Sequence, residues 1–381
     1  MKIVIVGTAY PLRGGIAHYN AILFRHLSAN HSVDMVTFTR QYPKIFFPGK
    51  TQEEKGGQES AVPSEQLIDS INPWTWYKAA KAIAGKKPDL LIFKYWMPFF
   101  APCFGTIALL VKRWTGATVL FICDNVIPHE KRIGDTALTR YAFAAVDSFI
   151  VQSGAVEREL KEFYHQARYE LVPHPVYEIF GSSLPKQKAR QELGIRDERV
   201  ILFFGYVRRY KGLHILLDAM PEILKALQVR LLVVGEFYDD EQKYRQQIEQ
   251  LKLGGAVQVH SDYVPNEEVS KYFCAADVVV LPYVSATQSG IVQIAYQFDK
   301  PVIATDVGGL SEVVLNDRTG YIVKPESPAE VANAVVRFYN EGRESEFVQN
   351  VKTEKKKYSW ENLVQAIERL TDDAEPGDAG R

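Results

Sequence analysis

The sequence predicts an α/β protein with two domains, each built on a parallel β-sheet. Short runs rich in Val, Ile and Leu alternate with helical patterns along nearly the whole chain, which is typical of βαβ units. In addition, the length of 381 residues exceeds what one ordinary hydrophobic core organises. We therefore expect two α/β halves of similar size.

In the first half, the expected strands are short apolar runs: Lys2–Val6, Ser32–Phe38, Asp89–Lys94, Thr118–Cys123, Ser148–Val151 and Tyr169–Val172. Amphipathic patterns between these runs predict helices at Gly15–Ser28, Pro73–Gly85, Phe99–Trp114 and Gly154–Phe163.

The second half repeats the alternation, with strands expected at Val200–Phe204, Arg230–Val234, Val257–His260, Val278–Leu281, Val302–Ala304 and Gly320–Val323. Its helices are expected at Gly212–Leu227, Asp240–Leu251, Asn266–Cys274, Gly290–Phe298, Leu310–Leu315, Ser327–Tyr339, Glu346–Lys357 and Trp360–Leu370.

The domain boundary is expected near Pro173 and Pro175, because prolines interrupt both strands and helices. A polar tail with Pro376 and Gly377 is expected to be disordered. The predicted organisation is an N-terminal domain, a C-terminal domain, a helix that packs back on the N-terminal domain and the tail: residues 1–178, 179–358, 359–371 and 372–381.

The composition argues against a nucleic-acid-binding or secreted protein. With 45 basic and 46 acidic residues the formal charge is −1, so any phosphate recognition must be local. Cys103, Cys123 and Cys274 are far apart and odd in number, which favours a reducing compartment over disulfides or a zinc site. The apolar run from Phe99 to Val111 is too short to span a membrane, and the N-terminus has no signal-peptide pattern. We therefore expect a cytoplasmic protein without a nucleic-acid partner.

A cationic loop follows the buried strand Val200–Phe204. The chain turns at Gly205, and Arg208 and Lys211 then precede a helix that starts at Gly212. Such a loop, between the carboxyl end of a parallel strand and a helix N-terminus, is where α/β proteins bind phosphorylated ligands. Taken alone, the loop is equally well a solvated basic turn.

A second site of the same kind follows the strand Val278–Leu281. A small polar loop leads to a helix start at Ser289, and the free backbone amides there are expected to belong to Gly290, Ile291 and Val292. Ser289 is alternatively only a helix cap. Together the two loops can bind a diphosphate with no metal ion and no other cofactor.

The first strand is followed by a loop that ends in Gly14 and Gly15. Its glycine spacing differs from G-x-G-x-x-G, which disfavours binding of NAD or FAD. Two glycines before a helix still let backbone amides approach an anion or a sugar, and a flexible loop explains them equally well.

At this point the chain resembles glycosyltransferase family 4, the group 1 transferases. The resemblance covers nearly the whole sequence, and its most specific part is the segment Lys300–Glu312. The other segments that carry it are Gly14-Gly15, Asn125–Glu130, Gly205–Gly212, Val234–Glu236 and Thr319–Val323. It implies the GT-B fold, in which two Rossmann-like domains with parallel sheets face an interdomain cleft.

The resemblance also implies a reaction, the retaining transfer of a hexose-type sugar from a nucleotide diphosphate sugar to a polysaccharide or lipid-linked glycan of the cell envelope. Arg208 and Lys211 would then stabilise the charge on the leaving diphosphate. The residues expected to bind the donor are Gly14, Gly15, Gly205, Arg208, Lys211, Glu236, Ser289, Gly290, Ile291 and Val292.

The sequence departs from the family pattern in two places. Ala286 and Ile294 stand where the family has two glutamates, the second of which binds the ribose. Ribose recognition then falls to Glu236, Glu312 or the backbone. Asp124 stands where the family commonly has a histidine, and it is either a contact to a sugar hydroxyl, a base or a loop cap.

The acceptor side is expected in the first half. Asn125, His129 and Glu130 follow a strand end there, and we expect His129 to take part in catalysis beside Asp124, although an ordinary structural histidine is the alternative. Asp239 and Asp240 are expected to cap a helix rather than bind a metal ion.

Two other functions share these features: a nucleotide-sugar 2-epimerase of the same fold, and an inactive sugar-binding scaffold. One further hypothesis concerns Arg40–Lys50, a loop that places Phe46 and Phe47 between lysines. It would dock peripherally on the inner leaflet of the membrane, or it would fold over the acceptor cleft.

Overall fold

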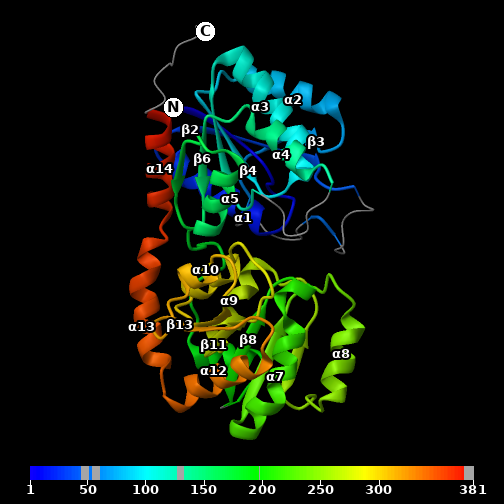
Figure 1. Ribbon diagram of the computed structural model, residues 1–381, viewed down its shortest axis with the longest axis vertical. Coiled ribbons are helices and arrows are strands. Elements are labelled where there is room, and N and C mark those ends of the chain that lie inside the picture. Colours follow the sequence, from blue (N-terminus) through cyan, green and yellow to red (C-terminus); the bar gives the residue numbers. More distant parts are fainter. Residues whose placement is uncertain (44–50, 54–60, 127–132, 197, 373–381) are drawn as a thin grey trace. The chain divides into compact units, whose positions relative to one another are not determined.

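The computed structural model divides the chain into two compact units and describes residues 1–43, 51–53, 61–126, 133–196 and 198–372. Unit 1 combines Met1–Pro175 with Ser359–Arg381, and unit 2 is Val176–Tyr358 (Figure 1). Residues 176–178 were expected in the first domain, but they belong to unit 2, where the Val176 amide donates to the carbonyl of Tyr358 at 2.9 Å.

Unit 1 contains a seven-stranded parallel sheet in the order β3-β2-β1-β4-β5-β6-β7. The strands are β1 Lys2–Val6, β2 Ser32–Arg40, β3 Glu65–Asp69, β4 Leu90–Tyr95, β5 Thr118–Cys123, β6 Ser148–Val151 and β7 Tyr169–Leu171. The helices are α1 Gly15–Ser28, α2 Pro73–Gly85, η3 Pro98–Phe100, α3 Ala101–Thr115, α4 Asp135–Phe143, α5 Gly154–Phe163 and α14 Trp360–Asp372.

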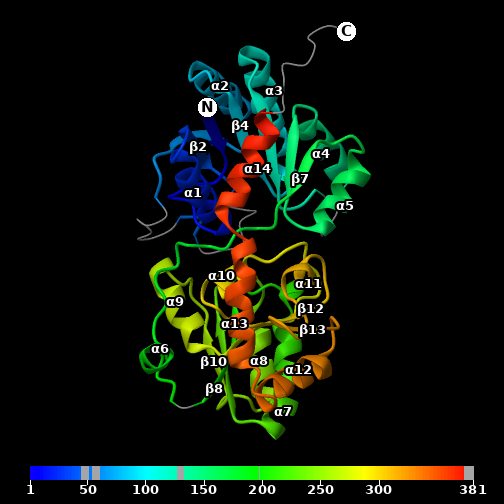
Figure 2. The same ribbon diagram turned by 90° about the vertical axis from the view of Figure 1, so that its left-hand side faces the viewer.

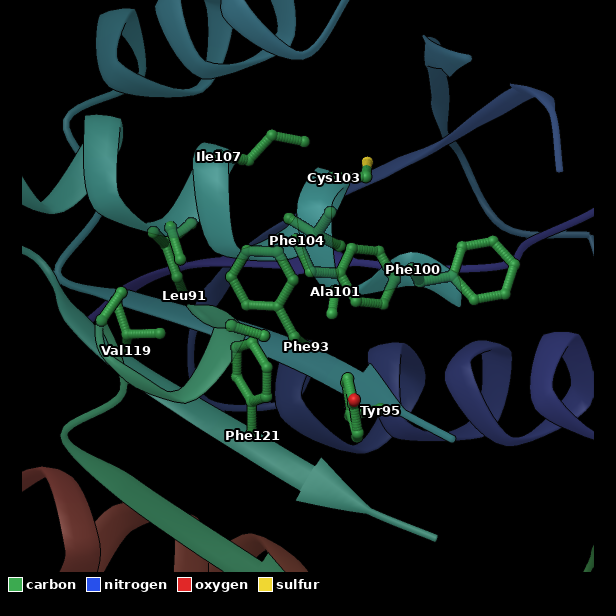
Figure 3. Close-up of a cluster of buried hydrophobic side chains, with 14 of the residues drawn as sticks. Leu91, Phe93, Tyr95, Phe100, Ala101, Cys103, Phe104, Ile107, Val119 and Phe121 are labelled. Carbon is green, nitrogen blue, oxygen red and sulfur yellow. The ribbon is translucent and has the colours of Figure 1, made fainter. Parts of the chain in front are cut away.

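Helices cover both faces of this sheet, as parallel sheets require. Helix α14 packs beside α1 on one face (Figure 2), whereas α2, α3 and α4 contribute to the core on the other. Figure 3 shows that core, where Phe93 of β4 lies 5.0 Å from Phe121 of β5 and 5.3 Å from Phe104 of α3, measured between ring centroids. Asp372, which was expected in the tail, ends α14, and residues 373–381 lie outside the described residues.

Unit 2 contains a six-stranded parallel sheet in the order β10-β9-β8-β11-β12-β13. The strands are β8 Arg199–Phe204, β9 Val229–Val234, β10 Val257–His260, β11 Val278–Leu281, β12 Val302–Thr305 and β13 Gly320–Val323. The helices are α6 Lys186–Glu192, η4 Arg209–Lys211, α7 Leu213–Ala226, α8 Glu241–Gln250, α9 Asn266–Ala275, α10 Gly290–Gln297, α11 Leu310–Val313, α12 Pro328–Asn340, α13 Glu344–Glu354 and η5 Lys355–Lys357.

Each sheet has one position where the strand order reverses. In unit 1 this switch point lies between β1 and β4, and in unit 2 it lies between β8 and β11. The chain departs to opposite sides at such a point, which leaves a crevice at the carboxyl ends of the two strands, where α/β proteins bind ligands. The loops that follow β1, β8 and β11 are among those that the sequence singles out.

Candidate functional site in unit 2

Two loops meet at the switch point of unit 2. The first runs from Gly205 through η4 to Gly212, and the second follows β11 from Pro282. They approach so closely that a Cβ atom on Gly212 would lie 1.8 Å from the carbonyl oxygen of Pro282. The amide of Val284 also donates to the carbonyl of Tyr210 at 2.7 Å. The backbone therefore fixes the two loops side by side.

Lys211 points its ammonium group into this junction. The residue is 9% exposed, and its Nζ lies 3.0 Å from where a Cβ on Gly205 would be and 5.7 Å from the ring centroid of Tyr283. Burial, together with the positive charge of Arg208, lowers its pKa to about 8. None of the carboxylates in the described parts of the chain forms an ion pair with it. A buried charge is costly without a partner, so this position suits an anionic ligand.

Helix α10 begins beside the same junction, because Ile291 Cδ1 lies 3.1 Å from where a Cβ on Gly205 would be. Ser289 caps the helix and accepts a hydrogen bond from the amide of Ile291 at 3.3 Å. The amide of Val292 donates to the carbonyl of Ser289 at 3.2 Å. The expectation of free amides at Ile291 and Val292 is therefore wrong, because the cap engages both. The amide of Gly290 donates to none of the described residues.

Arg208 lies at the outer edge of the site. Its guanidinium is 5.0 Å from the ring centroid of Tyr238, and that ring packs on Tyr206 with 4.5 Å between centroids. Glu236 is buried, and its backbone is tied to the same loop, because its carbonyl accepts a bond from the Val207 amide at 2.9 Å. Arg208 and Lys211 thus belong to one loop, and the backbone of Glu236 is hydrogen-bonded to that loop.

The Lys300–Glu312 segment supports the second loop. A Cβ on Gly308 would lie 1.7 Å from the carbonyl oxygen of Ala286, so only a glycine fits there. The amide of Gly309 donates to the carbonyl of Thr287 at 2.9 Å, and Thr305 Oγ1 donates to the carbonyl of Tyr283 at 2.6 Å. Thr305, Gly308 and Gly309 of this segment therefore hold the second loop in place. Glu312 is exposed, whereas Ile294 is buried.

Candidate functional site in unit 1 and the comparisons

The loop after β1 ends at Gly14, whose φ of 115° favours glycine. Gly14 precedes α1, and its carbonyl accepts a bond from the His18 amide at 3.2 Å. No described atom lies within 4 Å of where a Cβ on Gly14 would be. The space beside Gly14 is therefore open to approach by a ligand.

Asp124 forms an ion pair that the sequence did not predict. Its Oδ1 lies 2.6 Å from Nζ of Lys94, a residue of β4 that is 1% exposed. The same ammonium donates to Gln152 Oε1 at 2.6 Å and lies 3.7 Å from the ring centroid of Tyr19. Burial lowers the pKa of Lys94, and the Asp124 carboxylate opposes that effect. The cluster ties the carboxyl ends of β4, β5 and β6 to α1.

His174 closes this cluster where the chain leaves unit 1. Its ring meets Tyr19 edge-on at 5.1 Å, and Trp360 of α14 packs against the same tyrosine at 4.9 Å. Nδ1 of His174 donates to the carbonyl of Pro175 at 2.7 Å. Burial, followed by the charge of Lys94, lowers the pKa of His174 to about 4, so the imidazole is neutral at pH 7.

The other residues expected on the acceptor side are only partly described. Asn125 Nδ2 donates to the carbonyl of Trp96 at 3.2 Å, which positions the loop after β5. His129 and Glu130 lie outside the described residues.

The two aspartates expected to act as caps have hydrogen-bond donors nearby. Asp240 caps α8 and accepts a bond from the Gln242 amide at 3.1 Å, while Asp239 accepts one from Tyr244 OH at 3.3 Å. Within the described ranges, no group of His, Cys, Asp and Glu side chains could hold a metal ion. No helix there is long and apolar enough to cross a membrane.

Comparisons with known proteins show similarity to glycosyltransferases. Residues 198–341 match the family model described as "Glycosyl transferases group 1". The chain is 29% identical to a D-inositol 3-phosphate glycosyltransferase of Corynebacterium urealyticum over 75% of this chain and 72% of that protein. It is 31% identical to the uncharacterized glycosyltransferase MJ1607 of Methanocaldococcus jannaschii, over 46% of this chain and 45% of that protein.

Among solved structures, the Anabaena protein Alr3699/HepE in complex with UDP-glucose superposes with a TM-score of 0.75 at 18% identity. The match covers 98% of this chain and 100% of the Anabaena chain. The fold is therefore GT-B, and residues 198–341, which contain the site in unit 2, are similar to the group 1 glycosyltransferases.

Proposed function

We propose that this glycosyltransferase moves a hexose-type sugar from a nucleotide diphosphate sugar to a polysaccharide or lipid-linked glycan acceptor, with retention of the anomeric configuration. The observation that carries the proposal is the buried ammonium of Lys211, which has no carboxylate partner among the described residues and lies beside the start of α10. A diphosphate would satisfy this charge. The proposal is also supported by the complexes of the Anabaena relative with UDP and with UDP-glucose.

The leaving diphosphate is the group that gains negative charge as the glycosidic bond to the donor breaks. Lys211 and Arg208 would stabilise that charge from one side, and the amide of Gly290 at the start of α10 would do so from another. Because these groups are already fixed by the backbone contacts between the two loops, little reorganisation is needed during the reaction. No metal ion is required in this scheme.

Retention is proposed to follow a front-face path. The acceptor hydroxyl attacks the anomeric carbon on the side from which the diphosphate departs, and a diphosphate oxygen takes the proton of that hydroxyl. Asp124 in unit 1 would hydrogen-bond the transferred sugar or the acceptor, since its ion pair with Lys94 holds the carboxylate in one orientation. The expected acceptor lies at the cytoplasmic leaflet of the cell envelope.

A thermal-shift panel of UDP, GDP, ADP and CMP sugars tests the donor half of the proposal, because binding raises the melting temperature by mass action. One class of nucleotide sugar should stabilise the wild-type protein. Lys211→Ala and Arg208→Ala should each lower sugar transfer by roughly a hundredfold. Arg209→Ala is the matched control, since Arg209 is an exposed cation between Arg208 and Lys211 to which the proposal gives no role. Wild-type turnover in the Lys211 and Arg208 variants would disprove the diphosphate site.

A further inference from the structure

The outer face of α2 carries aromatic and cationic side chains that the proposed reaction does not use. Trp74, Tyr77, Lys78 and Lys81 are spaced as i, i+3, i+4 and i+7, so they share one face of the helix, and all are exposed. The opposite face packs into the core of unit 1 through the buried residues Ala79, Ala80 and Ile83. Helix α2 is therefore anchored on one side and exposes large rings on the other.

Helix α3 extends this surface with Trp114. The rings of Trp74 and Tyr77 stack at 5.7 Å with an interplanar angle of 15°, and Trp114 meets Tyr77 edge-on at 5.7 Å. Trp74 is 62% exposed, Tyr77 42% and Trp114 43%. Neither indole N–H donates to a described residue. Exposed rings that lie in contact with one another, rather than singly, are typical of an interaction site.

The charge around the three rings is positive. Helices α2 and α3 contain no aspartate or glutamate. Lys78, Lys81 and Arg113 are exposed, and no carboxylate in the described parts of the chain pairs with any of them. Lys78 Nζ lies 5.6 Å from the ring centroid of Trp74. This local excess contrasts with the formal charge of −1 of the whole chain.

We propose that this surface, defined as Trp74, Tyr77 and Trp114 with Lys78, Lys81 and Arg113, docks unit 1 on an anionic lipid bilayer. Indole and phenol rings combine an apolar body with a polar tip, which suits the headgroup layer, and lysine and arginine extend their charges to anionic headgroups. The complementarity of charge favours an anionic over a neutral membrane. A second copy of this chain is an alternative occupant that light scattering distinguishes.

Docking at this surface differs from the expectation for Phe46 and Phe47, which lie outside the described residues. If the proposed function holds, docking also has a consequence for the reaction. Unit 1 carries Asp124, so docking would bring the acceptor side to a lipid-linked glycan. Membrane binding itself depends on no step of sugar transfer.

Vesicle co-sedimentation tests the docking surface directly. The full chain is mixed with vesicles of phosphatidylcholine alone or of equal parts phosphatidylcholine and phosphatidylglycerol. Two triple variants separate the contributions: Trp74→Ser with Tyr77→Ser and Trp114→Ser removes the rings, whereas Lys78→Gln with Lys81→Gln and Arg113→Gln removes the charges. The matched charge control replaces three exposed lysines of unit 2, namely Lys188→Gln, Lys243→Gln and Lys356→Gln.

The wild type should bind the anionic vesicles, and high salt should weaken that binding. Loss of the three charges near the surface should lower the vesicle affinity by roughly a hundredfold, and loss of the rings by at least about tenfold. The control should bind as the wild type does. All variants should keep the thermal shift given by the nucleotide sugar, which shows that they are folded and keeps this test separate from the donor site.

Four results would overturn the docking proposal. The first three are the absence of wild-type binding to anionic vesicles, equal binding to both vesicle types, and the same loss of affinity in the unit 2 control. A fourth is a dimer in light scattering that the ring variant abolishes while vesicle binding persists, because the surface would then join two copies of the chain.

Discussion

Replacing Lys211 by methionine tests whether the proposed donor site keeps an unpaired charge for its ligand. Methionine retains much of the length of the side chain and removes the ammonium group. The pKa of Lys211 is about 8 instead of the ordinary 10.5. Each pKa unit corresponds to about 1.4 kcal/mol, so the charged form costs the free protein roughly 3 kcal/mol of unfolding free energy near pH 7. We expect the variant without ligand to be more stable than the wild type by up to about that amount.

The pH dependence gives this prediction a definite sign. Between pH 8 and 10.5, the unfolded chain still holds the Lys211 proton while the folded protein has lost it. Because the unfolded state binds more protons there, the free energy of unfolding of the wild type rises with pH across that window. The charge penalty is present in full below the window and disappears above it. The stability advantage of Lys211→Met should therefore shrink as pH rises toward 10.5.

Urea denaturation of both proteins at several pH values measures the effect, with Arg209→Ala as the control for loss of a nearby charge. Addition of UDP should reverse the order, since a diphosphate stabilises the wild-type ammonium and raises the unfolding free energy by mass action. The reasoning fails if the free Lys211→Met protein is less stable than the wild type at pH 7 and gains as much stability from UDP.

Further substitutions test the other contacts. Lys94→Met leaves the Asp124 carboxylate without its buried partner and should lower the free energy of unfolding by about 3 kcal/mol in urea denaturation. Adding Asp124→Asn should restore part of that free energy, and equal losses in the single and double variants would refute the coupling. Asp124→Ala should keep the thermal shift by nucleotide sugar but lower kcat by roughly a hundredfold, and an unchanged kcat would rule out contact with the reacting groups. Gly308→Ala would place its Cβ 1.7 Å from the Ala286 carbonyl and should weaken UDP binding, whereas Gly342→Ala, which also has a positive φ but meets no atom within 4 Å, should not. EDTA should leave turnover unchanged, and activity that disappears and returns with Mg²⁺ or Mn²⁺ would contradict metal independence.

Most of the fold could be predicted because its signals are local. Buried parallel strands such as β5 and β11 are continuous apolar runs, and the structure confirms them. Strand β3 was missed because it begins with Glu65 and ends with Asp69, as edge strands often carry charges. Helix α6 was missed because Lys186–Glu192 is polar on nearly every side, so no amphipathic pattern indicates it.

The positions of the two loops proposed to bind the donor could also be predicted locally, since in each case a strand, a loop and a helix start follow one another in sequence. What the sequence did not reveal is the environment of each charge. Lys94 stands within an apolar strand, and that position was the available signal, but its partners come from β5, β6 and α1. Only the pairing of those strands brings Asp124 and Gln152 to it. The burial of Lys211 likewise depends on Tyr283 and Ile291, far away in the sequence.

The most direct test of the central claim is an NMR analysis of products from the stabilising nucleotide sugar, with and without a glycan acceptor. The proposal predicts that a glycoside forms only when the acceptor is present, that the nucleoside diphosphate is released, and that the new bond has the anomeric configuration of the donor. Inversion would contradict the front-face path. A 2-epimer formed without acceptor would identify an epimerase, and binding without any turnover across a panel of acceptors would identify a sugar-binding scaffold.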